Sequence, residues 1–401
     1  MTAPRIRTQA PSDIDELTAL RAQFPILAGH PELAYLDSAA TAQKPQAVLD
    51  AVQAYLTTTN ANAGRGTYTW ANRTTALVEE TRDRVKRFLG DPEPERSAVH
   101  FTSGTTEGLR AIARDWLPQL LADGDEIVVP VADHQANISP WLEVRQQLAG
   151  QGVRVRVLPM PYQQASGDYD HTALASLAGP RTRFVAVTHV HHVYGGNMNI
   201  HRIREAVGPD AVICLDAAQS VGHLPVSVAA LDVDFVVFSG HKAMALPGSG
   251  AVWVRQTRGP AFAPGGWPGT PNTVGIASLA AALDWLEAAG PDRIERWTVA
   301  LAARLTDRLR HLDAFEILGC RTSVAADSRV QRRQGIVTFR HRDIDSGDLG
   351  FILFSHGFMV CSDSHCQGAA GEKADSVRVS LHVYNSMEEI DRLLSVLATL
   401  G

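Results

Sequence analysis

From residue 98 to residue 255, short apolar runs alternate with amphipathic stretches, and this alternation limits the possible folds more than any other feature of the chain. Apolar runs bounded by turn residues indicate strands, and helical stretches between them indicate right-handed crossovers. Runs such as 235–238 are apolar throughout, which is typical of strands buried on both faces of a sheet. We therefore expect an α/β fold with a large, doubly wound and mainly parallel sheet. The expected strands are 98–101, 126–130, 153–158, 183–190, 211–216, 234–240 and 250–254, and the expected helices are 104–121, 140–149, 172–178 and 200–207.

A cluster of Gly and Pro at 259–271 interrupts this pattern and indicates a loop near the end of the first domain. Helical stretches at 273–289 and 291–312 follow, then apolar runs near 315–318, 335–340, 358–361 and 376–381, with helices expected at 344–356 and 387–400. A chain of 401 residues is long enough for two or three domains. We expect an N-terminal tail at 1–20, a large domain at 21–285 whose N-terminal segment packs on the small domain, and a small C-terminal α/β domain at 286–401.

Composition and charge argue against several classes of function. Apolar residues make up 45% of the chain and charged residues 20%, which is ordinary for a globular protein. The net charge of −6, with no run of Lys or Arg, argues against nucleic acid or a membrane surface as a partner. No apolar stretch reaches the ~18 residues of a spanning helix, residues 1–11 lack the apolar region of a signal peptide, and the cysteines form no CxxC pair. We expect a cytoplasmic protein with reduced thiols.

A turn rich in Gly and hydroxyl residues, 103–108, lies between an expected strand and an expected helix. Such a turn presents backbone N–H groups and the positive end of a helix to an anion, most simply a phosphate. The alternative is an ordinary helix cap, because Thr followed by Glu often begins a helix. Neither a P-loop lysine nor a GxGxxG pattern is present, so a phosphorylated cofactor other than a nucleotide is favoured.

Two further motifs follow neighbouring strands. Asp216 ends the run 211–216, where a carboxylate can hold a protonated ring nitrogen; the alternative is a helix-capping aspartate. Lys242 ends the motif 239–242 (SGHK), where a lysine in a pocket can form a Schiff base; the alternative is a solvated surface lysine. The motif also matches the SxxK pattern of serine acylases, but their SDN and KTG partners are missing.

A phosphate-binding turn, a carboxylate for a ring nitrogen and a Schiff-base lysine are together what pyridoxal phosphate requires. His134 follows the strand 126–130 and is placed to lie over the cofactor ring, although it also fits an ordinary loop histidine. The sequence therefore predicts a pyridoxal phosphate site at the carboxyl ends of the strands.

More motifs accompany these along nearly the whole chain: 35–40 (YLDSAA), 104–108 (GTTEG), 133–137 (DHQAN), 188–190 (THV), 216–219 (DAAQ), 239–242 (SGHK), 269–272 (GTPN) and 377–381 (VRVSL). With them the chain resembles the class V, fold-type I pyridoxal phosphate enzymes, and among these the cysteine desulfurases of the SufS and CsdA type. The resemblance implies a fold-type I transferase fold, an amino acid substrate and a homodimer with shared active sites.

The resemblance also implies roles for single residues. Lys242 would bind the cofactor covalently, and His134 would stack on its ring. The other cofactor contacts would be Asp216 to the pyridine nitrogen, Gln219 near the ring hydroxyl, Thr105 or Thr106, Ser239 and His241 to the phosphate, and Thr270 to the phosphate of the second subunit. Arg378 would clamp the substrate carboxylate, and Cys366 would receive sulfur as a persulfide.

The departures from the family are concentrated on the substrate side. Where the family has Arg-x-Gly-His-His-Cys, this chain has 361–366 (CSDSHC), so Cys361 replaces an arginine. Where the family has a histidine before Arg65, this chain has Gly64, and where the family has an asparagine, this chain has His192. The segment between Trp253 and Gly269 is also shorter than in the family. The expected substrate-binding residues are Arg378, His192, Gly64, Arg65 and Cys361, and we expect a wider pocket with a different charge. Losing one guanidinium partner of a carboxylate typically costs about 2 to 5 kcal/mol, so L-cysteine cannot be assumed as the substrate.

Three hypotheses of function remain. The first is an enzyme that cleaves the carbon–sulfur or a neighbouring bond of an S-substituted cysteine or related amino acid. The second is an L-cysteine desulfurase in which Cys366 attacks the substrate sulfur, and the third is a catalytically silent interaction protein. A β-eliminating lyase does not need Cys366, so this thiol separates the first two. No metal site is expected, because the histidines at 189–192 lack the spacing of zinc ligands.

Overall fold

A computed structural model describes residues 19–163, 166–263, 270–319, 333–363, 365 and 375–401. Most of the expected tail, and with it Cys320 and Cys366, lies outside these residues. No helix among the described residues is long and apolar enough to span a membrane.

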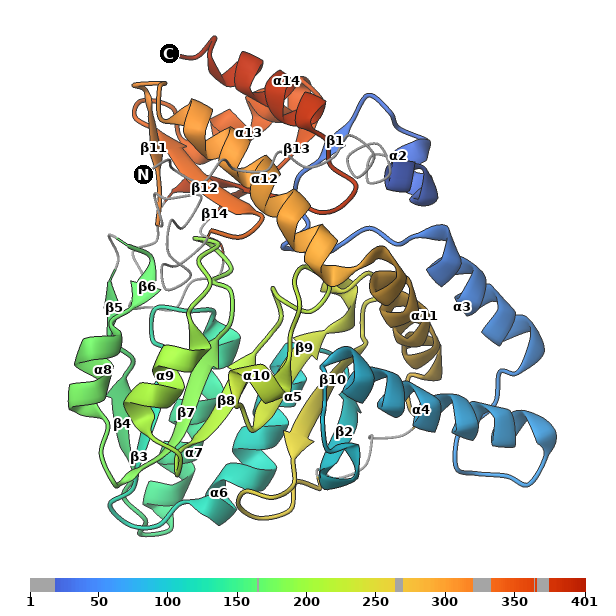
Figure 1. The fold of residues 1–401 in the computed structure, drawn as a ribbon, viewed down its shortest axis with the longest axis vertical. Helices are drawn as coiled ribbons and strands as arrows, with labels where there is room; N and C mark the ends of the chain where they lie inside the picture. The colour runs from blue at the N-terminus through green and yellow to red at the C-terminus, as the bar shows by residue number, and fades with distance from the viewer. Residues whose placement is uncertain (1–18, 164–165, 264–269, 320–332, 364, 366–374) are drawn as a thin grey trace, which may run out of the picture.

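A seven-stranded sheet forms the centre of the larger part of the molecule (Figure 1). Its strand order is β2-β10-β9-β8-β7-β3-β4, and every neighbouring pair from β9 to β4 is parallel, which confirms the doubly wound α/β fold. The last strand in sequence, β10, runs antiparallel to both of its neighbours. The bounds are β2 (Ser97–Thr102), β3 (Glu126–Val129), β4 (Arg156–Pro159), β7 (Thr182–Thr188), β8 (Val212–Asp216), β9 (Phe235–Ser239) and β10 (Gly250–Arg255).

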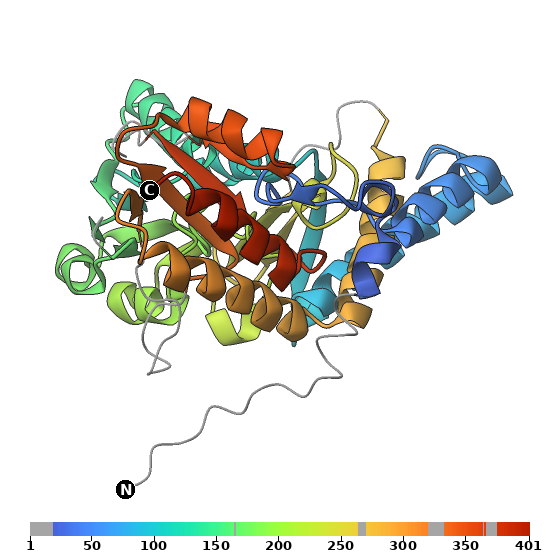
Figure 2. The ribbon, with the colours of Figure 1, turned by 90° about the horizontal axis from the view of Figure 1, so that it is seen from above.

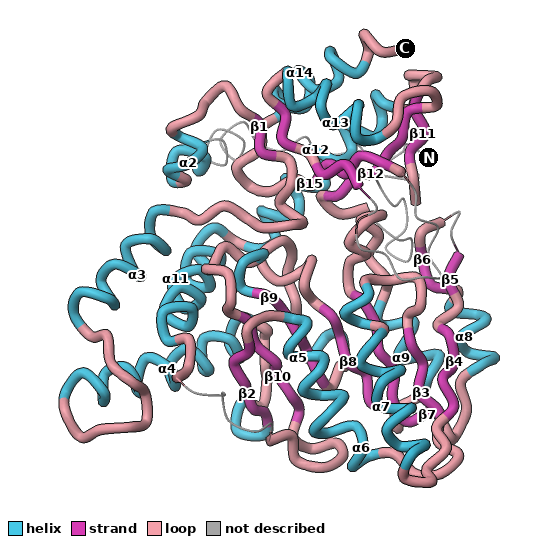
Figure 3. Tube along the Cα trace, turned by 180° about the vertical axis from the view of Figure 1, so that it is seen from behind, coloured by secondary structure: helices cyan, strands magenta, loops and turns pink. Residues whose placement is uncertain are grey.

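Helices cover both faces of this sheet. The helices α9 (Ile200–Val207) and α10 (Val228–Leu231) cover the face of the sheet that is turned to the viewer in Figure 1. The opposite face, seen in Figure 3, is covered by α5 (Thr105–Ala111), α6 (Leu117–Leu120) and α7 (Ser139–Gly150). Beyond β4, the helix α8 (His171–Leu177) packs on α9, next to the hairpin of β5 (Tyr162–Gln163) and β6 (Asp168–Tyr169).

Two expected elements of the larger part of the molecule differ from the structure. The single helix expected at 104–121 is interrupted by a π-helical turn, η3 (Ile112–Trp116), just before Pro118, which has no N–H to continue the helical hydrogen bonds. The strand expected from residue 153 begins only at Arg156, because the N–H of Val153 donates to the carbonyl of Leu148 and closes the turn after α7.

The N-terminal helices flank the large sheet on one side. The helix α11 (Thr273–Ala289) packs against both α3 (Gln46–Thr58) and α4 (Thr69–Phe88), and the last two project from the side of the molecule in Figure 1. The shorter elements before and between them are η1 (Arg21–Gln23), α2 (Pro25–Ala28), β1 (Ala34–Tyr35) and η2 (Pro94–Arg96).

A second, four-stranded antiparallel sheet lies above the first, with the order β11-β12-β15-β14. The helix α12 packs on β11 and β12 and α13 packs on β14 and β15, and Figure 2 shows these helices and α14 side by side across the sheet. The expected strand at 358–361 is divided, because β13 pairs in parallel with β1 whereas β14 pairs with β15. The domain limits remain predictions. The bounds are α12 (Pro291–Leu309), β11 (Phe315–Ile317), β12 (Ile336–His341), α13 (Ser346–Ser355), β13 (Phe358–Met359), β14 (Cys361–Asp363), β15 (Ser376–Ser380) and α14 (Met387–Leu397).

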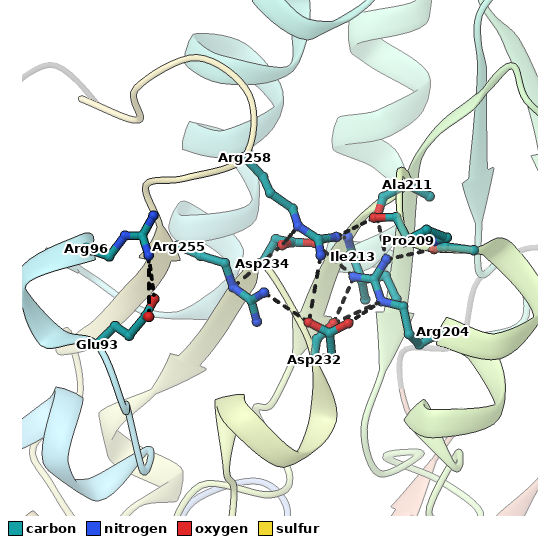
Figure 4. A network of polar contacts seen from close by, with 11 residues as sticks. Glu93, Arg96, Arg204, Pro209, Ala211, Ile213, Asp232, Asp234, Arg255 and Arg258 are labelled. Atoms are coloured by element: carbon teal, nitrogen blue, oxygen red, sulfur yellow. Dashed lines mark hydrogen bonds and ion pairs between the residues drawn. The ribbon is translucent and has the colours of Figure 1, made fainter.

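A network of charged side chains closes the large sheet at the amino ends of β8 and β9 (Figure 4). The carboxylate of Asp234, only 1% exposed, accepts hydrogen bonds from the N–H of Ile213 at 2.9 Å and from Arg204 at 3.0 Å. Arg255 and Arg258 lie 3.8 and 3.4 Å from its other oxygen. Both oxygens of the buried carboxylate thus lie close to arginine side chains, although only Oδ2 accepts hydrogen bonds from described residues, so this network has a structural role at the end of the sheet opposite the pocket described next.

Candidate active site

A cavity of about 220 Å³ lies at the carboxyl ends of the parallel strands, the usual ligand site of open α/β sheets. The loops after β3, β7, β8 and β9 and the first turn of α5 form its wall. Most of the residues expected to bind the cofactor, together with His192, line it. The lining residues are Thr105, Thr106, His134, Ala136, Thr188, Val190, His192, Asp216, Ala218, Gln219, Ser239, His241 and Lys242.

The first turn of α5 and the end of β9 form one side of the cavity. The Ser239 hydroxyl oxygen lies 2.8 Å from both the backbone nitrogen and the hydroxyl oxygen of Thr105, and both residues are buried. Gly104, with φ of 152°, allows this approach, since a Cβ there would lie 3.1 Å from the Ser239 hydroxyl oxygen. A helix start leaves N–H groups without partners inside the helix, so this side suits an anion.

Asp216 lies at the end of β8, 6% exposed. Its Oδ1 accepts a hydrogen bond from the N–H of Ala218 at 2.9 Å. Burial raises the pKa of Asp216 to about 6, although the Ala218 N–H and the charge of Lys242 act in the opposite direction. A buried carboxylate with a raised pKa gains most from a cationic partner, such as a protonated ring nitrogen. Beside it, the amide nitrogen of Gln219 donates to the carbonyl of Ala39 at 3.0 Å.

The ring of His134 has a fixed orientation. Its Nδ1 accepts a hydrogen bond from the N–H of Ala136 at 3.1 Å, so the neutral ring bears its proton on Nε2. Burial, followed by the charge of Lys242, lowers the pKa of His134 to about 4. The ring centroid lies 5.0 Å from that of His192, with the two planes nearly perpendicular. His134 is therefore a neutral, flat group on the wall of the cavity.

Lys242 closes the short helix η5 (Gly240–Lys242) directly after β9 and is half-buried. The pKa of neighbouring His241 is lowered to about 4 by burial, and then by the charges of Lys242 and Lys44. Lys44 is itself half-buried, and burial lowers its pKa to about 8. Two amines thus lie near the site, of which only Lys242 lines the cavity.

The four-stranded sheet contributes the opposite side of the site. Arg378 on β15 is 5% exposed; its Nη1 donates to the carbonyl of His192 at 3.1 Å and its Nη2 lies 3.1 Å from Oδ1 of Asp37. Its Nε is buried and makes no hydrogen bond with any residue that the structure describes. Cys361 on β14 lies directly opposite Arg378 in the strand register. Both residues therefore lie behind His192, one step from the cavity wall.

Besides Arg378 and Cys361, three further expected site residues are not brought to the cavity by this chain. Gly64, Arg65 and Thr270 are exposed and line no part of it, so their roles at a shared active site remain predictions. Cys366 lies outside the described residues. The described residues contain no group of three His, Cys, Asp or Glu side chains close enough to hold a metal ion.

Two carboxylates of the site were not expected from the sequence. Asp133, fully buried, accepts a hydrogen bond from the Tyr169 hydroxyl and lies 3.4 Å from Nε2 of His191, and burial raises its pKa to about 6. Its charge also raises the pKa of Asp216. Asp37 pairs with Arg378. Both lie in motifs that the sequence singled out, and a carboxylate within an otherwise apolar or small-residue run was the available signal.

The pyridoxal phosphate implied by the resemblance fits the residues present. The hydroxyls of Thr105 and Ser239 at a helix start suit its phosphate, the buried Asp216 suits its ring nitrogen, and Lys242 suits its aldehyde carbon. The close approach of Gly250 to Gly104, where a Cβ on Gly250 would lie 2.7 Å from the Gly104 Cα, keeps side chains out of the phosphate side.

Comparison with known proteins agrees with this site. A family model described as aminotransferase class V matches residues 34–393. A probable cysteine desulfurase of Vibrio cholerae is 34% identical, over 95% of this chain and 97% of that protein, and a cysteine desulfurase of Cronobacter sakazakii is 33% identical, over 94% and 97%. Among solved structures, the apo cysteine desulfurase of Thermococcus onnurineus NA1 superposes with a TM-score of 0.83 at 28% identity, over 99% of both chains. The cysteine desulfurase CsdA of Escherichia coli superposes with a TM-score of 0.78 at 28% identity, over 96% of this chain and 98% of that chain.

Proposed function

Because the chain belongs to the class V aminotransferase family, among its pyridoxal phosphate-dependent cysteine desulfurases, we propose that it cleaves the carbon–sulfur bond of L-cysteine with Cys366 as the sulfur acceptor. The observation that supports this most is the convergence of Lys242, Asp216 and the Thr105–Ser239 pair on one cavity. The relatives favour this hypothesis over the lyase hypothesis that the substrate-side departures suggested.

The residues of the chain have separate tasks in this proposal. The bound cofactor supplies an electron sink for bonds broken next to the substrate amine. The Nζ of Lys242 would hold the cofactor and would move a proton at the substrate, and the ionised Asp216 would keep the proton on the ring nitrogen. His134, with its proton held on Nε2 by the Ala136 contact, would pack against the ring. Arg378 orients the substrate through its carboxylate.

The products separate desulfuration from elimination. Desulfuration of L-cysteine leaves alanine and a persulfide on the protein, whereas β-elimination of L-cysteine leaves pyruvate, ammonia and hydrogen sulfide. We expect the wild-type protein to form alanine from L-cysteine and Cys366→Ala to form almost none, with the cofactor retained. A Cys366→Ala protein that turns over L-cysteine as fast as the wild type would contradict the proposal.

A second candidate is a carbon–sulfur lyase acting on an S-substituted cysteine. The observation in its favour is the place of Cys361, opposite Arg378 in the register, where the resemblance led us to expect a second arginine. Pyruvate released from S-methyl-L-cysteine by both the wild type and Cys366→Ala would support this candidate instead.

We further propose a homodimer with shared active sites. Leu56, Tyr68 and Trp70, on or next to the projecting helices α3 and α4, are 47%, 54% and 56% exposed. Exposed large apolar side chains grouped on one projection are typical of a protein interface. Arg65 and Thr270 are also exposed, which fits contacts to a second subunit. We expect Trp70→Glu to shift the protein toward a monomer in light scattering; a wild-type monomer with full activity would contradict the proposal.

A further inference from the structure

Cys361 belongs to a row of side chains that faces the cavity wall. Thr338 on β12, Arg378 on β15 and Cys361 on β14 are directly opposite one another in the register, and such residues project from the same face of a sheet. The Thr338 hydroxyl donates to the carbonyl of Val193, and Arg378 donates to the carbonyl of His192. The row therefore faces the segment that contributes His192 to the cavity.

The Cys361 thiol contacts a positioned imidazole. Its Sγ lies 3.5 Å from Nδ1 of His365, and Nε2 of His365 lies 3.0 Å from the Ser376 hydroxyl. His365 and Ser376 are both buried, and Cys361 is half-buried. The carbonyl of His365 accepts a hydrogen bond from Nε2 of His192 at 3.0 Å. A thiol, an imidazole and a group that orients the imidazole are the parts of an activated cysteine nucleophile.

A cationic residue, Arg378, is the direct neighbour of Cys361 in the strand register. Side chains directly opposite on antiparallel strands lie about 5 Å apart at Cβ, so the Arg378 and Cys361 side chains leave the sheet next to each other on the same face. Asp37 neutralises part of its charge at Nη2, but the Arg378 Nε is buried and has no hydrogen-bond partner within the described part of the chain. A buried donor without a described partner, on a residue that neighbours a nucleophile in the sheet, favours an anionic reactant, because the anion can satisfy the donor.

We propose that Cys361 and His365 form a second sulfur-accepting site that takes sulfane sulfur from a persulfide, an anionic sulfur donor. The Cys361 thiolate attacks the outer sulfur of R–S–SH after His365 takes the thiol proton. The bond between the two donor sulfurs breaks, a new S–S bond forms at Cys361, and R–S⁻ leaves with the electron pair and takes the proton. One thiol and one persulfide give one persulfide and one thiol, so no oxidant or reductant is needed.

This inference rests on the proposed function only for the source of the persulfide during turnover. It requires no role for Cys366 and can be tested with an added donor. The experiment uses cofactor-loaded Cys366→Ala protein, incubated with glutathione persulfide, alkylated, and analysed peptide by peptide by mass spectrometry.

We expect the peptide of Cys361 to gain one sulfur atom, and this gain to vanish in Cys361→Ser. His365→Asn should slow the gain by about tenfold or more, since positioned proton acceptors commonly contribute that much. Cys214 is fully buried and serves as the internal control thiol that stays unmodified. No gain at Cys361 in the folded protein, or an equal rate in His365→Asn, would overturn the inference.

Two additional measurements keep the outcomes separate. Ser376→Ala tests whether Ser376 orients His365, and the measurement is the rate at which Cys361 is alkylated. We expect this rate to fall while the cofactor absorbance stays unchanged. An unchanged alkylation rate would overturn the inference. Turnover of L-cysteine by the wild type is measured in parallel. Sulfur uptake at Cys361 without turnover would refute the proposed function alone, and turnover without uptake would refute this inference alone.

Discussion

The two sides of the cavity are built differently. On the side of the large sheet, Asp216 and Ser239 end strands and Thr105 begins a helix, so the backbone of each element places its side chain directly. On the side of the small sheet, the strand register places Arg378 and Cys361 opposite each other, and Arg378 also contacts the His192 carbonyl from behind. The cofactor side is therefore local in sequence, whereas the substrate side depends on pairing between distant segments.

Replacing the lysine of the cofactor side should have the largest effect. In Lys242→Ala we expect turnover to fall by about a thousandfold or more, because both the covalent attachment and the proton transfer are lost. Borohydride reduction followed by denaturing mass spectrometry should find the cofactor on Lys242 in the wild type and on no residue in the variant.

The matched control is Lys44→Gln, since Lys44 is the other half-buried amine near the site and burial lowers its pKa to about 8. It should keep the reducible bond. If the cofactor stays attached in Lys242→Ala and is lost in Lys44→Gln, then Lys44, and not Lys242, is the residue that holds it.

On the substrate side, Arg378→Ala should lower kcat/KM by about a hundredfold, because the carboxylate loses a buried guanidinium. Cofactor content should stay unchanged, since Arg378 does not line the cavity. Arg378→Lys keeps the charge but not the planar pair of donors, so we expect it to recover only part of the loss. Cofactor loss in Arg378→Ala would show that the two sides are not independent.

Asp216→Asn tests the carboxylate of the cofactor side. A charge-assisted hydrogen bond to the ring nitrogen is worth about 1.5 to 3 kcal/mol, so we expect turnover to fall by about 10- to 100-fold with the cofactor still bound. Spectra of the loaded variant, recorded with and without amino acid, provide the measurement. Full turnover in the variant would remove Asp216 from the proposed mechanism.

The same substitution makes a prediction about stability in the cofactor-free protein. The pKa of Asp216 is about 6 when folded, above its ordinary value of 3.8, so its protonated form stabilises the folded state at low pH. This contribution is lost as the pH rises through about 6. We expect Asp216→Asn to raise the free energy of unfolding by about 1 to 3 kcal/mol at pH 8, and to change it little at pH 4. Denaturant titrations at the two pH values give the comparison, and equal changes at both would contradict the burial argument.

The sequence predicted the cofactor side of the cavity better than the substrate side. Asp216, Ser239 and Lys242 could be placed because strand ends are visible in a single run of apolar residues. The pairing of Arg378 with Asp37 spans 341 positions, and no periodicity within either segment indicates it. The contact of Cys361 with His365 depends on a residue with φ of 54°, in the left-handed region that sequence patterns rarely reveal for histidine. The π-helical turn before Pro118 was missed because its helix has the same apolar pattern on both sides.

The smallest expected effect concerns the phosphate side. Ser239→Ala removes one hydroxyl that lies 2.8 Å from Thr105, and a single neutral hydrogen bond contributes about 0.5 to 1.5 kcal/mol. We therefore expect the cofactor Kd to rise by about two- to tenfold, measured in the Lys242→Ala background so that covalent attachment does not hide the change. Ser249→Ala is the control, because Ser249 is equally buried and donates to the carbonyl of Leu246 without lining the cavity. An unchanged Kd in Ser239→Ala, or an equal rise in both variants, would mean that the phosphate is held elsewhere and that the cofactor side is less local than the strand ends suggest.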